Sequence, residues 1–405
     1  MMLSPTGASG SGRALMTAGS GLIAVTYGLI RFGYGLHLPA FAAEFALSPA
    51  MAGGIASGSF GGYCAAALLA QRLISSGHAR LTLWVACALA VSGSLTVAAA
   101  QTSMSLGVGV IVAGSAAGAA SPALVAAVAT TVSPAGQDRA QAVVNSGTGA
   151  GVVAGGLVFA ALSEQWRGLW ASFAVASLLV TAAVDRRAAW PADVTVLPAR
   201  GVGQASTPLR PAVLAAVLAG AGSAAVWTFG IELLTGTGGL RPPTTAVLWC
   251  LLGAAGVLGA LSGDLVQVCG LRSAWTICAT VMAGATLGLA WLPSHTAVAA
   301  AALASFGGAY IALSGVLIAW ATRTMPQRAA EATATLFIAL TAGQALGAIT
   351  LGVVADRTTL AAAFIIAAGL LLGSLAAVRP QVRLGAGRRS QLGAEPDEAH
   401  CEEVA

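Results

Sequence analysis

The sequence contains no lysine, and only 8% of its 405 residues are charged, whereas about 25% is usual for a soluble domain. Hydrophobic residues make up 57% of the chain, and the mean hydropathy is +0.84. This composition excludes a soluble globular protein and indicates an integral membrane protein. The formal net charge of +5 is weak evidence for an anionic partner, because arginines near span ends mainly set orientation. We expect no nucleic-acid partner.

Clustered metal ligands and catalytic groupings are also missing. The six cysteines are scattered without metal-ligand spacing, and five lie within or at the ends of apolar runs, where a thiol behaves as a small hydrophobe. The sequence has no Ser-His-Asp or Cys-His pattern, and its glycine runs lie inside apolar spans, where a phosphate-binding loop would make no sense. We therefore predict no disulfide, no metal, no cofactor and no enzymatic activity.

Long apolar runs are abundant. Each has about the length, roughly 17 to 25 helical residues, that crosses a hydrocarbon core of about 30 Å. The twelve predicted spans cover residues 14–38, 50–70, 81–100, 106–131, 142–162, 168–184, 212–236, 244–262, 274–292, 297–321, 333–355 and 359–378. They predict a cytoplasmic N-terminus (1–13), a six-helix bundle (14–184), a central cytoplasmic loop (185–211), a second six-helix bundle (212–378) and a disordered cytoplasmic tail (379–405).

The arginines support this topology. With the N-terminus inside, the cytoplasmic segments hold 15 arginines and the outer loops hold three, namely Arg167, Arg241 and Arg357. This asymmetry obeys the positive-inside rule. The first 13 residues are polar, and the span after them is too long for the apolar region of a signal peptide. We expect a multi-pass protein of a bacterial cytoplasmic membrane with both termini in the cytoplasm.

The two halves of the chain repeat. Pro134, Gly151 and Gly155 match Pro326, Gly343 and Gly347 at an offset of 192, and Gly77 matches Gly270 at 193. In the first helix of each half, Thr26-Tyr27-Gly28 matches Thr228-Phe229-Gly230 at an offset of 202. Such tandem halves are typical of many secondary transporters.

The twelve spans in a 6 + 6 repeat, the long central loop and the motifs below resemble the major facilitator superfamily over about residues 14–378. The first span, with Gly28-Leu29-Ile30-Arg31-Phe32-Gly33-Tyr34 followed by Leu38-Pro39, is similar to the uncharacterised bacterial YbfB-like branch. The resemblance implies an all-α membrane fold of two pseudo-symmetric six-helix bundles and a protein that works as a monomer.

The loop between helices 2 and 3 resembles the superfamily signature G-x-L-a-D-r-x-G-r, whose acid and arginines form a cytoplasmic latch. The first half has Gln71 where the acid belongs, followed by Arg72. In the second half Asp264 precedes Gly270 and Arg272. The resemblance implies that Asp264, Arg272, Arg72 and Gln71 form a cytoplasmic gate. Alternatively, Asp264 only favours a neighbouring helix N-terminus through the helix dipole.

Helix 5 carries a run of small residues, Gly147-Thr148-Gly149-Ala150-Gly151-Val152-Val153-Ala154-Gly155-Gly156. It is similar to the G-P-x-x-G-G core of the superfamily's antiporter motif, with Val152 in place of proline. Small residues at this spacing also let two helices approach closely in lipid. Close helix packing therefore explains Gly147, Gly151, Gly155 and Gly156 as well as an antiport role does.

Arg31 and Glu232 are ionisable residues inside helices 1 and 7, which line the central cavity of a major facilitator fold. A charge inside a span must face water or a protein partner. The offset of 202 places Arg31 opposite position 233, so we predict that Arg31 and Glu232 lie at nearly equal depth and face each other. They would act either as an ion pair or as two ends of a substrate clamp, with Glu232 as a proton carrier if substrate separates them.

Five further residues are candidates for substrate contacts. Tyr27 and Tyr34 share the helical face of Arg31, and Trp227 lies about one turn before Glu232. Asn145 in helix 5 and Gln344 in helix 11 are uncharged polar groups that would orient substrate or make interhelical hydrogen bonds. Ordinary packing is the alternative for the aromatic residues.

The sequence thus predicts a secondary active transporter that moves a small organic solute by alternating access, with proton-coupled efflux as the first hypothesis. Proton symport or facilitated uptake of a metabolite is the alternative within this class. A transport-dead sensor or a polytopic membrane enzyme is the alternative outside it, but such proteins should show a soluble domain or clustered catalytic residues. The predicted partners are a small molecule, protons and the lipid bilayer.

Overall fold

The computed structural model describes residues 10–190, 209–258 and 262–378, almost all of them helical. The first rod is continuous through three segments, α1 (Gly10–Ile23), the π-helix η1 (Ala24–Arg31) and α2 (Gly33–Phe45). The rest of the first half consists of α3 (Pro49–Ser75), α4 (Ala79–Ala98), α5 (Ser103–Thr131), α6 (Gln137–Leu162) and α7 (Trp166–Asp185). The second half consists of α8 (Arg210–Glu232) with the π-helix η5 (Leu233–Thr237), α9 (Pro242–Leu258), α10 (Ser262–Trp291), α11 (Thr296–Thr324), α12 (Ala329–Arg357) and α13 (Leu360–Gly373).

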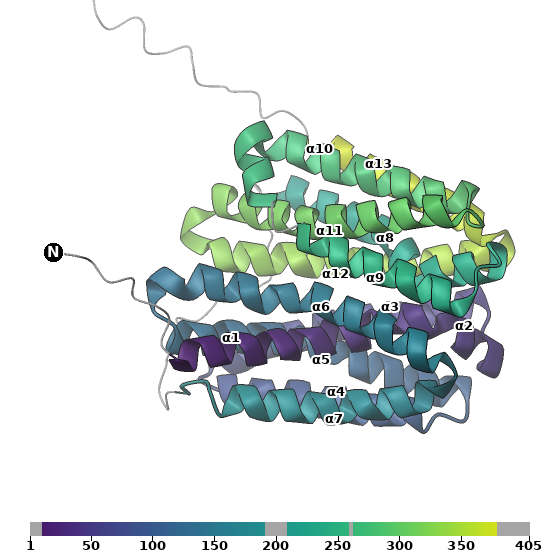
Figure 1. Cartoon of the computed structure of the whole chain (residues 1–405). Helices are drawn as coiled ribbons and strands as arrows, with labels where there is room; N and C mark the ends of the chain where they lie inside the picture. The colour runs from purple at the N-terminus through teal and green to yellow at the C-terminus, as the bar shows by residue number, and fades with distance from the viewer. Residues whose placement is uncertain (1–9, 191–208, 259–261, 379–405) are drawn as a thin grey trace, which may run out of the picture.

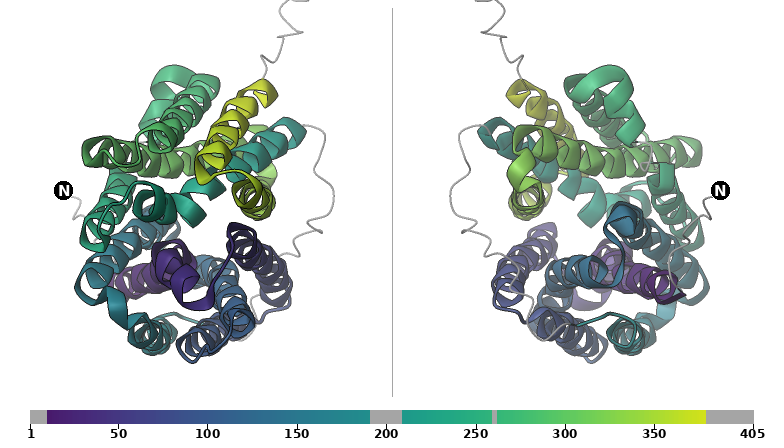
Figure 2. Two further views of the ribbon diagram at one scale, coloured as in Figure 1. Left: turned by 90° about the vertical axis from the view of Figure 1, so that its right-hand side faces the viewer. Right: turned by 90° about the vertical axis from the view of Figure 1, so that its left-hand side faces the viewer.

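These helices form two bundles that lie side by side with their axes roughly parallel (Figure 1). The end-on views of Figure 2 separate the N-lobe, α1 to α7, from the C-lobe, α8 to α13. Counting each rod once gives twelve helices in the described ranges, as predicted. Ten of them meet a simple length and hydropathy criterion for a membrane span, and α3 and α9 complete the set.

Glycines permit the closest contacts between the lobes. The lobes meet where α3 packs on α12, α6 on α9 and α2 on α8. A methyl group added to Gly35 would lie 2.0 Å from the carbonyl oxygen of Trp227, and one added to Gly53 would lie 2.3 Å from that of Ala348. Since lipid tails provide no hydrophobic drive for helix association, backbone approach of this kind is a main source of packing energy.

The helix ends agree with the repeat. Gly77 and Gly270 have positive φ angles of 83° and 81°, a backbone conformation that favours glycine. Gly77 lies in the connection between α3 and α4, and Gly270 breaks α10 into two helical parts. In the N-lobe, Ser48 caps α3, and Thr102 and Ser105 form a capping box at the start of α5.

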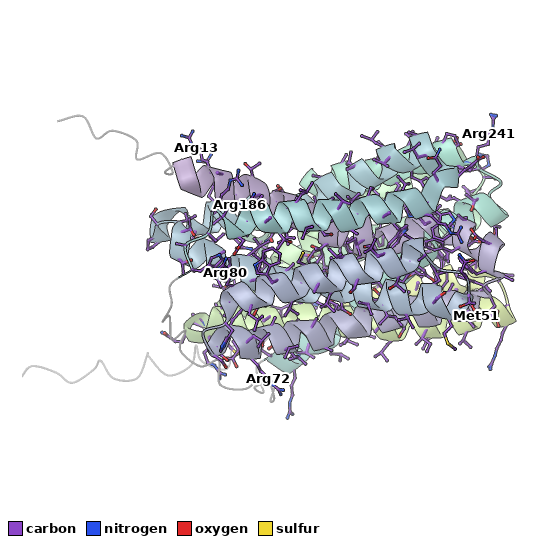
Figure 3. The ribbon with its side chains drawn as sticks, turned by 90° about the horizontal axis from the view of Figure 1, so that it is seen from below. Arg13, Met51, Arg72, Arg80, Arg186 and Arg241 are labelled. Atoms are coloured by element: carbon purple, nitrogen blue, oxygen red, sulfur yellow. The ribbon has the colours of Figure 1, made fainter. Side chains whose placement is uncertain are left out.

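The two ends of the molecule differ in charge. Arg13, Arg72, Arg80 and Arg186 gather at one end of the bundle, and Arg241 lies at the other (Figure 3). Exposed leucine, isoleucine and valine side chains cover the outer faces of α4, α7, α10 and α13, which is the surface that lipid requires. The predicted tail and most of the central loop lie outside the described residues.

Candidate functional site

Arg31 closes the π-helical segment of the first rod. The Phe32 amide donates to the carbonyl oxygen of Tyr27, five residues earlier, at 2.9 Å. This wide turn rotates Arg31 toward the other lobe, and its side chain is only 6% exposed. Single π turns inside α-helices often occur at functional sites.

The guanidinium of Arg31 crosses from the N-lobe to α12 of the C-lobe. Its Nη2 donates to Oε1 of Gln344 at 2.9 Å and to Oγ1 of Thr341 at 3.3 Å. The amide nitrogen of Gln344 donates in turn to the hydroxyls of Tyr310 at 3.0 Å and of Ser223 at 3.4 Å. Helices from both lobes therefore meet in one buried polar network, which we call the Arg31 network.

Aromatic rings surround the same guanidinium. Its central carbon lies 4.2 Å from the ring centre of Tyr63, 5.2 Å from that of Phe60 and 5.5 Å from those of Tyr27 and Phe32. Tyr27 donates a hydrogen bond to the Tyr63 hydroxyl at 3.1 Å, which fixes both rings. Rings within about 6 Å stabilise a desolvated cation through their π faces.

Some of the other predicted contact residues lie beside Arg31, and others lie away from it. Gln344 and Tyr27 lie beside Arg31, as described. Tyr34 instead points back within the N-lobe, where its hydroxyl donates to the carbonyl oxygen of Ala52 at 3.0 Å. Asn145 is exposed and accepts a 3.4 Å hydrogen bond from its neighbour Gln141.

Trp227 joins the lobes by stacking. Its ring lies 3.9 Å from that of Phe32, the residue after Arg31, and 5.2 Å from that of Tyr310. It therefore borders the Arg31 network through these rings, while its indole nitrogen is buried and has no hydrogen-bond partner.

Glu232 does not lie opposite Arg31, and the predicted equal depth is wrong. Ser223 shares the level of Arg31, because both bond to Gln344. Glu232 follows Ser223 by nine residues, which corresponds to a rise of about 13 Å along the helix. Among the described residues the ion pairs are Arg80–Asp185, Arg167–Glu44 and Arg328–Glu331, so Arg31 and Glu232 do not pair in this conformation.

The error came from the alignment of helices 1 and 7. Gly151 packs on the carbonyl group of Ala24, and its repeat partner Gly343 packs in the same way on Val217. Val217 therefore corresponds to Ala24, an offset of 193 and not 202. The C-lobe residue at the position of Arg31 is Ala224, which is fully buried.

Glu232 occupies a separate environment nearer the end of the bundle that carries Arg241. Its side chain is half-buried, and its Oε2 is buried without a hydrogen-bond partner. The adjacent residues Ile231 and Thr235 line a cavity of about 560 Å³ between the lobes. The rest of the lining comes from Pro39, Ala40, Ala43, Glu44, Phe159, Glu164, Trp166, Pro242 and Thr245.

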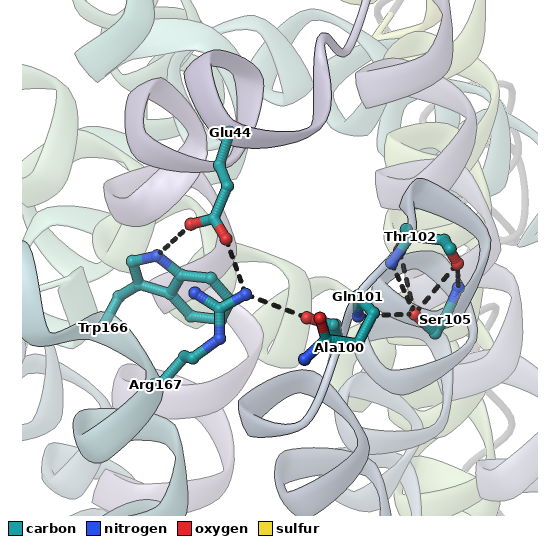
Figure 4. Close-up of polar contacts among 7 residues, drawn as sticks. All are labelled: Glu44, Ala100, Gln101, Thr102, Ser105, Trp166 and Arg167. Atoms are coloured by element: carbon teal, nitrogen blue, oxygen red, sulfur yellow. Dashed lines mark hydrogen bonds and ion pairs between the residues drawn. The ribbon is translucent and has the colours of Figure 1, made fainter.

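One wall of this cavity is a polar cluster that links the ends of α2 and α7 with the chain just before α5 (Figure 4). Glu44, in the last turn of α2, accepts a 3.0 Å hydrogen bond from the indole of Trp166 and forms a 2.6 Å ion pair with Arg167. Arg167 also donates to the carbonyl oxygen of Ala100, before α5, at 2.9 Å. The cluster lies within one lobe and does not bridge the two.

The glycines of α6 pack against two partners, the first rod of the N-lobe and α9 of the C-lobe. A methyl group on Gly147 would lie 2.1 Å from the carbonyl oxygen of Ser20, and one on Gly151 would lie 2.1 Å from that of Ala24. Gly155 has looser side-chain neighbours at 3.4 Å. Gly156 faces the C-lobe, where a methyl would lie 2.5 Å from the sulfur of Cys250. Close packing therefore accounts for Gly147, Gly151 and Gly156.

The predicted gate residues lie at the end of the bundle that carries most of the arginines. Arg72 and Arg272 are exposed, and Gln71 is half-buried. Asp264 lies in the first turn of α10, and its side chain is outside the described part of the structure. The N-lobe has an ion pair at this end that the sequence analysis missed, in which Arg80 holds both carboxylate oxygens of Asp185 at 2.8 Å.

Several members of the Arg31 network were not predicted from the sequence. The chain has four tyrosines, and three of them, Tyr27, Tyr63 and Tyr310, gather around this network. Thr341 precedes Gln344 by one helical turn and so shares its face. The scarcity of tyrosine is the signal that would have pointed to Tyr63 and Tyr310.

Comparison with known proteins agrees with this architecture. The family model described as "Uncharacterised MFS-type transporter YbfB" matches residues 23–379. This chain belongs to the YbfB-type family of the major facilitator superfamily. It is therefore a multi-pass membrane transporter that takes a small-molecule substrate. The search of curated proteins found no match.

Solved major facilitator structures share the fold at low sequence identity. The nucleoside transporter NupG is 13% identical with a TM-score of 0.70, over 91% of this chain and 98% of NupG. The xylose transporter XylE from E. coli, in an inward-open conformation, is 14% identical with a TM-score of 0.69, over 89% and 94%. The human organic anion transporter MFSD10 is 16% identical with a TM-score of 0.61, over 93% and 100%. At these identities the likeness shows only that this YbfB-type protein has the major facilitator fold.

Proposed function

We propose that the protein is a proton-coupled secondary transporter that exports a small organic solute across a bacterial cytoplasmic membrane by alternating access. The observation that carries the proposal is the Arg31 network, in which a buried cation of one lobe is bonded to Gln344 and Thr341 of the other. In an alternating-access cycle the lobes rock about a site at their interface. Bonds that cross this interface must break and re-form during the cycle, so a solute that competes for them is coupled to the motion.

Glu232 is the proposed proton site. Its Oε2 is buried and accepts no hydrogen bond, so it is free to carry a proton. It lies beside the outer cavity, about 13 Å from the level of Arg31 along the helix. Proton and solute would then bind at separate places on the same interface. Export rather than uptake is proposed because the glycine run of α6 resembles the superfamily's antiporter motif.

The topology forms part of the same proposal. The end of the bundle that carries Arg13, Arg72, Arg80 and Arg186 would face the cytoplasm, as the positive-inside rule requires (Figure 3). Both chain termini would lie on that side.

Proton flux in proteoliposomes tests the proposal. An imposed pH gradient is followed with a trapped pH-sensitive dye while solutes from a library are added. We expect at least one solute to collapse the gradient with the sign of antiport. The Glu232→Gln variant should lose this proton movement, whereas Asp138→Asn, which changes an exposed acid at the start of α6, should retain it.

Two outcomes would overturn the proposal. If no solute moves protons through the wild type, proton-coupled transport is wrong. If Glu232→Gln moves protons as fast as the wild type, the assignment of the proton site is wrong.

A further inference from the structure

Arg31 is a buried cation with no acidic partner in the described part of the chain. The ion pairs found there involve other residues at the helix ends. Among the described residues, Nη2 is the one guanidinium nitrogen with hydrogen-bond partners, and both acceptors, the Gln344 amide and the Thr341 hydroxyl, are neutral. Its Nε is buried and has no partner. The charge is therefore only partly compensated.

Neutral acceptors are poor substitutes for an anion at such a site. Removing a cation from water is costly unless a counter-charge and full hydrogen bonding replace the lost hydration. A carboxylate offers two parallel acceptors that match the fork of a guanidinium, and such charge-assisted bonds are about twice as strong as neutral ones. A carboxylate would therefore compensate the charge of Arg31 more fully than the neutral acceptors Gln344 and Thr341 do.

The residues around the guanidinium indicate the charge and polarity of the ligand that would fit there. The rings of Tyr27, Phe32, Phe60 and Tyr63 present mostly apolar surface around it. No second arginine joins this cluster in the described ranges, since the other described arginines lie at or near helix ends. One positive charge among aromatic faces suits a ligand with one negative charge and an apolar body, and it disfavours dianions and phosphorylated sugars.

We propose that the solute is an organic monocarboxylate with an apolar or aromatic body, whose carboxylate takes the place of Gln344 and Thr341 on Arg31. This inference rests on the proposed transport function and names its substrate class. It also gives a physical link between binding and motion: when the carboxylate occupies the guanidinium, the hydrogen bonds from Arg31 to α12 are lost. The stacking of Phe32 on Trp227 is among the contacts between the lobes that remain near this depth.

Matched acid and amide probes test this inference on the purified full-length protein. Benzoate, phenylacetate and hexanoate are each compared with the corresponding neutral amide, and phthalate serves as a dianion. Binding is measured as a concentration-dependent rise in Tm, because a ligand that binds only the folded state stabilises it. We expect at least one monocarboxylate to bind about tenfold or more tightly than its amide, because a site built for a charged acceptor rejects the neutral analogue.

Variants at Arg31 assign the effect to this residue. Arg31→Gln should abolish the preference for acid over amide, and Arg31→Lys should retain part of it, since it keeps the charge without the fork. Arg13→Gln, which removes an exposed arginine that lies in neither the proposed site nor the predicted gate, should behave as the wild type. The acid and amide comparison on the wild type does not depend on any variant folding.

The inference is overturned if none of the three monocarboxylates raises Tm, if acids and amides bind equally, or if folded Arg31→Gln keeps the preference. Its failure is distinguishable from failure of the transport function. Proton flux driven by neutral or cationic solutes, with no carboxylate binding, would leave transport standing and refute the substrate class. Carboxylates that bind but never cross a proteoliposome membrane would leave the ligand class standing and refute transport.

Discussion

The two lobes share the same helix packing but differ in the side chains at the interface between them. In each lobe a glycine of the fifth helix packs on a backbone carbonyl of the first helix. A methyl group added to Gly151 would lie 2.1 Å from the carbonyl oxygen of Ala24, and one added to Gly343 would lie 2.1 Å from that of Val217. At the level where the lobes meet, the correspondence fails. The N-lobe has Arg31 where the C-lobe has the buried Ala224, and the C-lobe has Gln344 where the N-lobe has the buried Val152.

This difference separates what the fold requires from what the transport site requires. The glycines are duplicated because both bundles need the same helix contact. The polar pair occurs once, with one member in each lobe, so the bond between Arg31 and Gln344 has no symmetric copy. A single asymmetric bond across the interface can form in one arrangement of the lobes and be lost in another. Two identical contacts related by the repeat distinguish the two arrangements less well.

The largest effect should come from breaking the shared packing. Gly151→Ala and Gly343→Ala each force a methyl group into a backbone carbonyl that cannot move as a side chain would. We expect each to lower the free energy of unfolding by about 3 kcal/mol, the upper part of the range for overpacking. Thermal unfolding followed by size-exclusion chromatography in detergent measures the loss.

Gly61→Ala is the matched control, because nothing lies within 4 Å of the added methyl group. It should leave Tm unchanged. If Gly343→Ala is as stable as the control while Gly151→Ala is not, the two lobes do not share this contact.

An intermediate effect should come from giving the C-lobe the same apolar residue that the N-lobe has at the position of Gln344. Gln344→Val copies the residue of the N-lobe and leaves the Nη2 of Arg31 with only its weaker bond to Thr341. We expect a loss of about 2 kcal/mol, the cost of an unsatisfied buried donor. Adding Arg31→Met to Gln344→Val should recover most of this stability, since replacing both polar partners by apolar groups is often neutral. Tm values of the single and double variants measure the coupling, and a double variant less stable than Gln344→Val would contradict it.

The smallest effect is expected at the arginine-rich end, where the lobes also differ. Arg80 pairs with Asp185 in the N-lobe, and the corresponding connection of the C-lobe carries the exposed Arg272. The Arg80 side chain is 62% exposed, so solvent screens its ion pair and the contribution of the pair should be small. Arg80→Ala and Arg272→Ala should therefore both leave Tm within measurement error. A clear loss for Arg80→Ala alone would show that this ion pair holds the N-lobe together.

Much of the fold followed from the sequence because the governing patterns are strong. Twelve apolar runs must each cross the bilayer as a helix, since lipid offers backbone groups no hydrogen-bond partners. Gly77 and Gly270 were paired correctly by the repeat, and the structure gives them nearly equal positive φ angles. Arg31 was identified as a buried charge between the lobes because no arginine is tolerated in lipid without a partner.

The depth of Glu232 could not be obtained in the same way. The match of Thr26-Tyr27-Gly28 to Thr228-Phe229-Gly230 rests on three common residues, whereas register is set by the glycines that touch backbone. The π-helical segment that ends at Arg31 adds a further local change of phase that periodicity does not reveal. Tyr63 and Tyr310 were missed because they come from other helices, and only tertiary packing brings them to the guanidinium.

The most direct test of the account is solute-driven proton flux through the Arg31→Met, Gln344→Val double variant in proteoliposomes, because that variant should fold well. We predict a monodisperse, stable protein that carries no solute and moves no protons. A folded double variant that transports at the wild-type rate would show that the Arg31 network does not bind the solute.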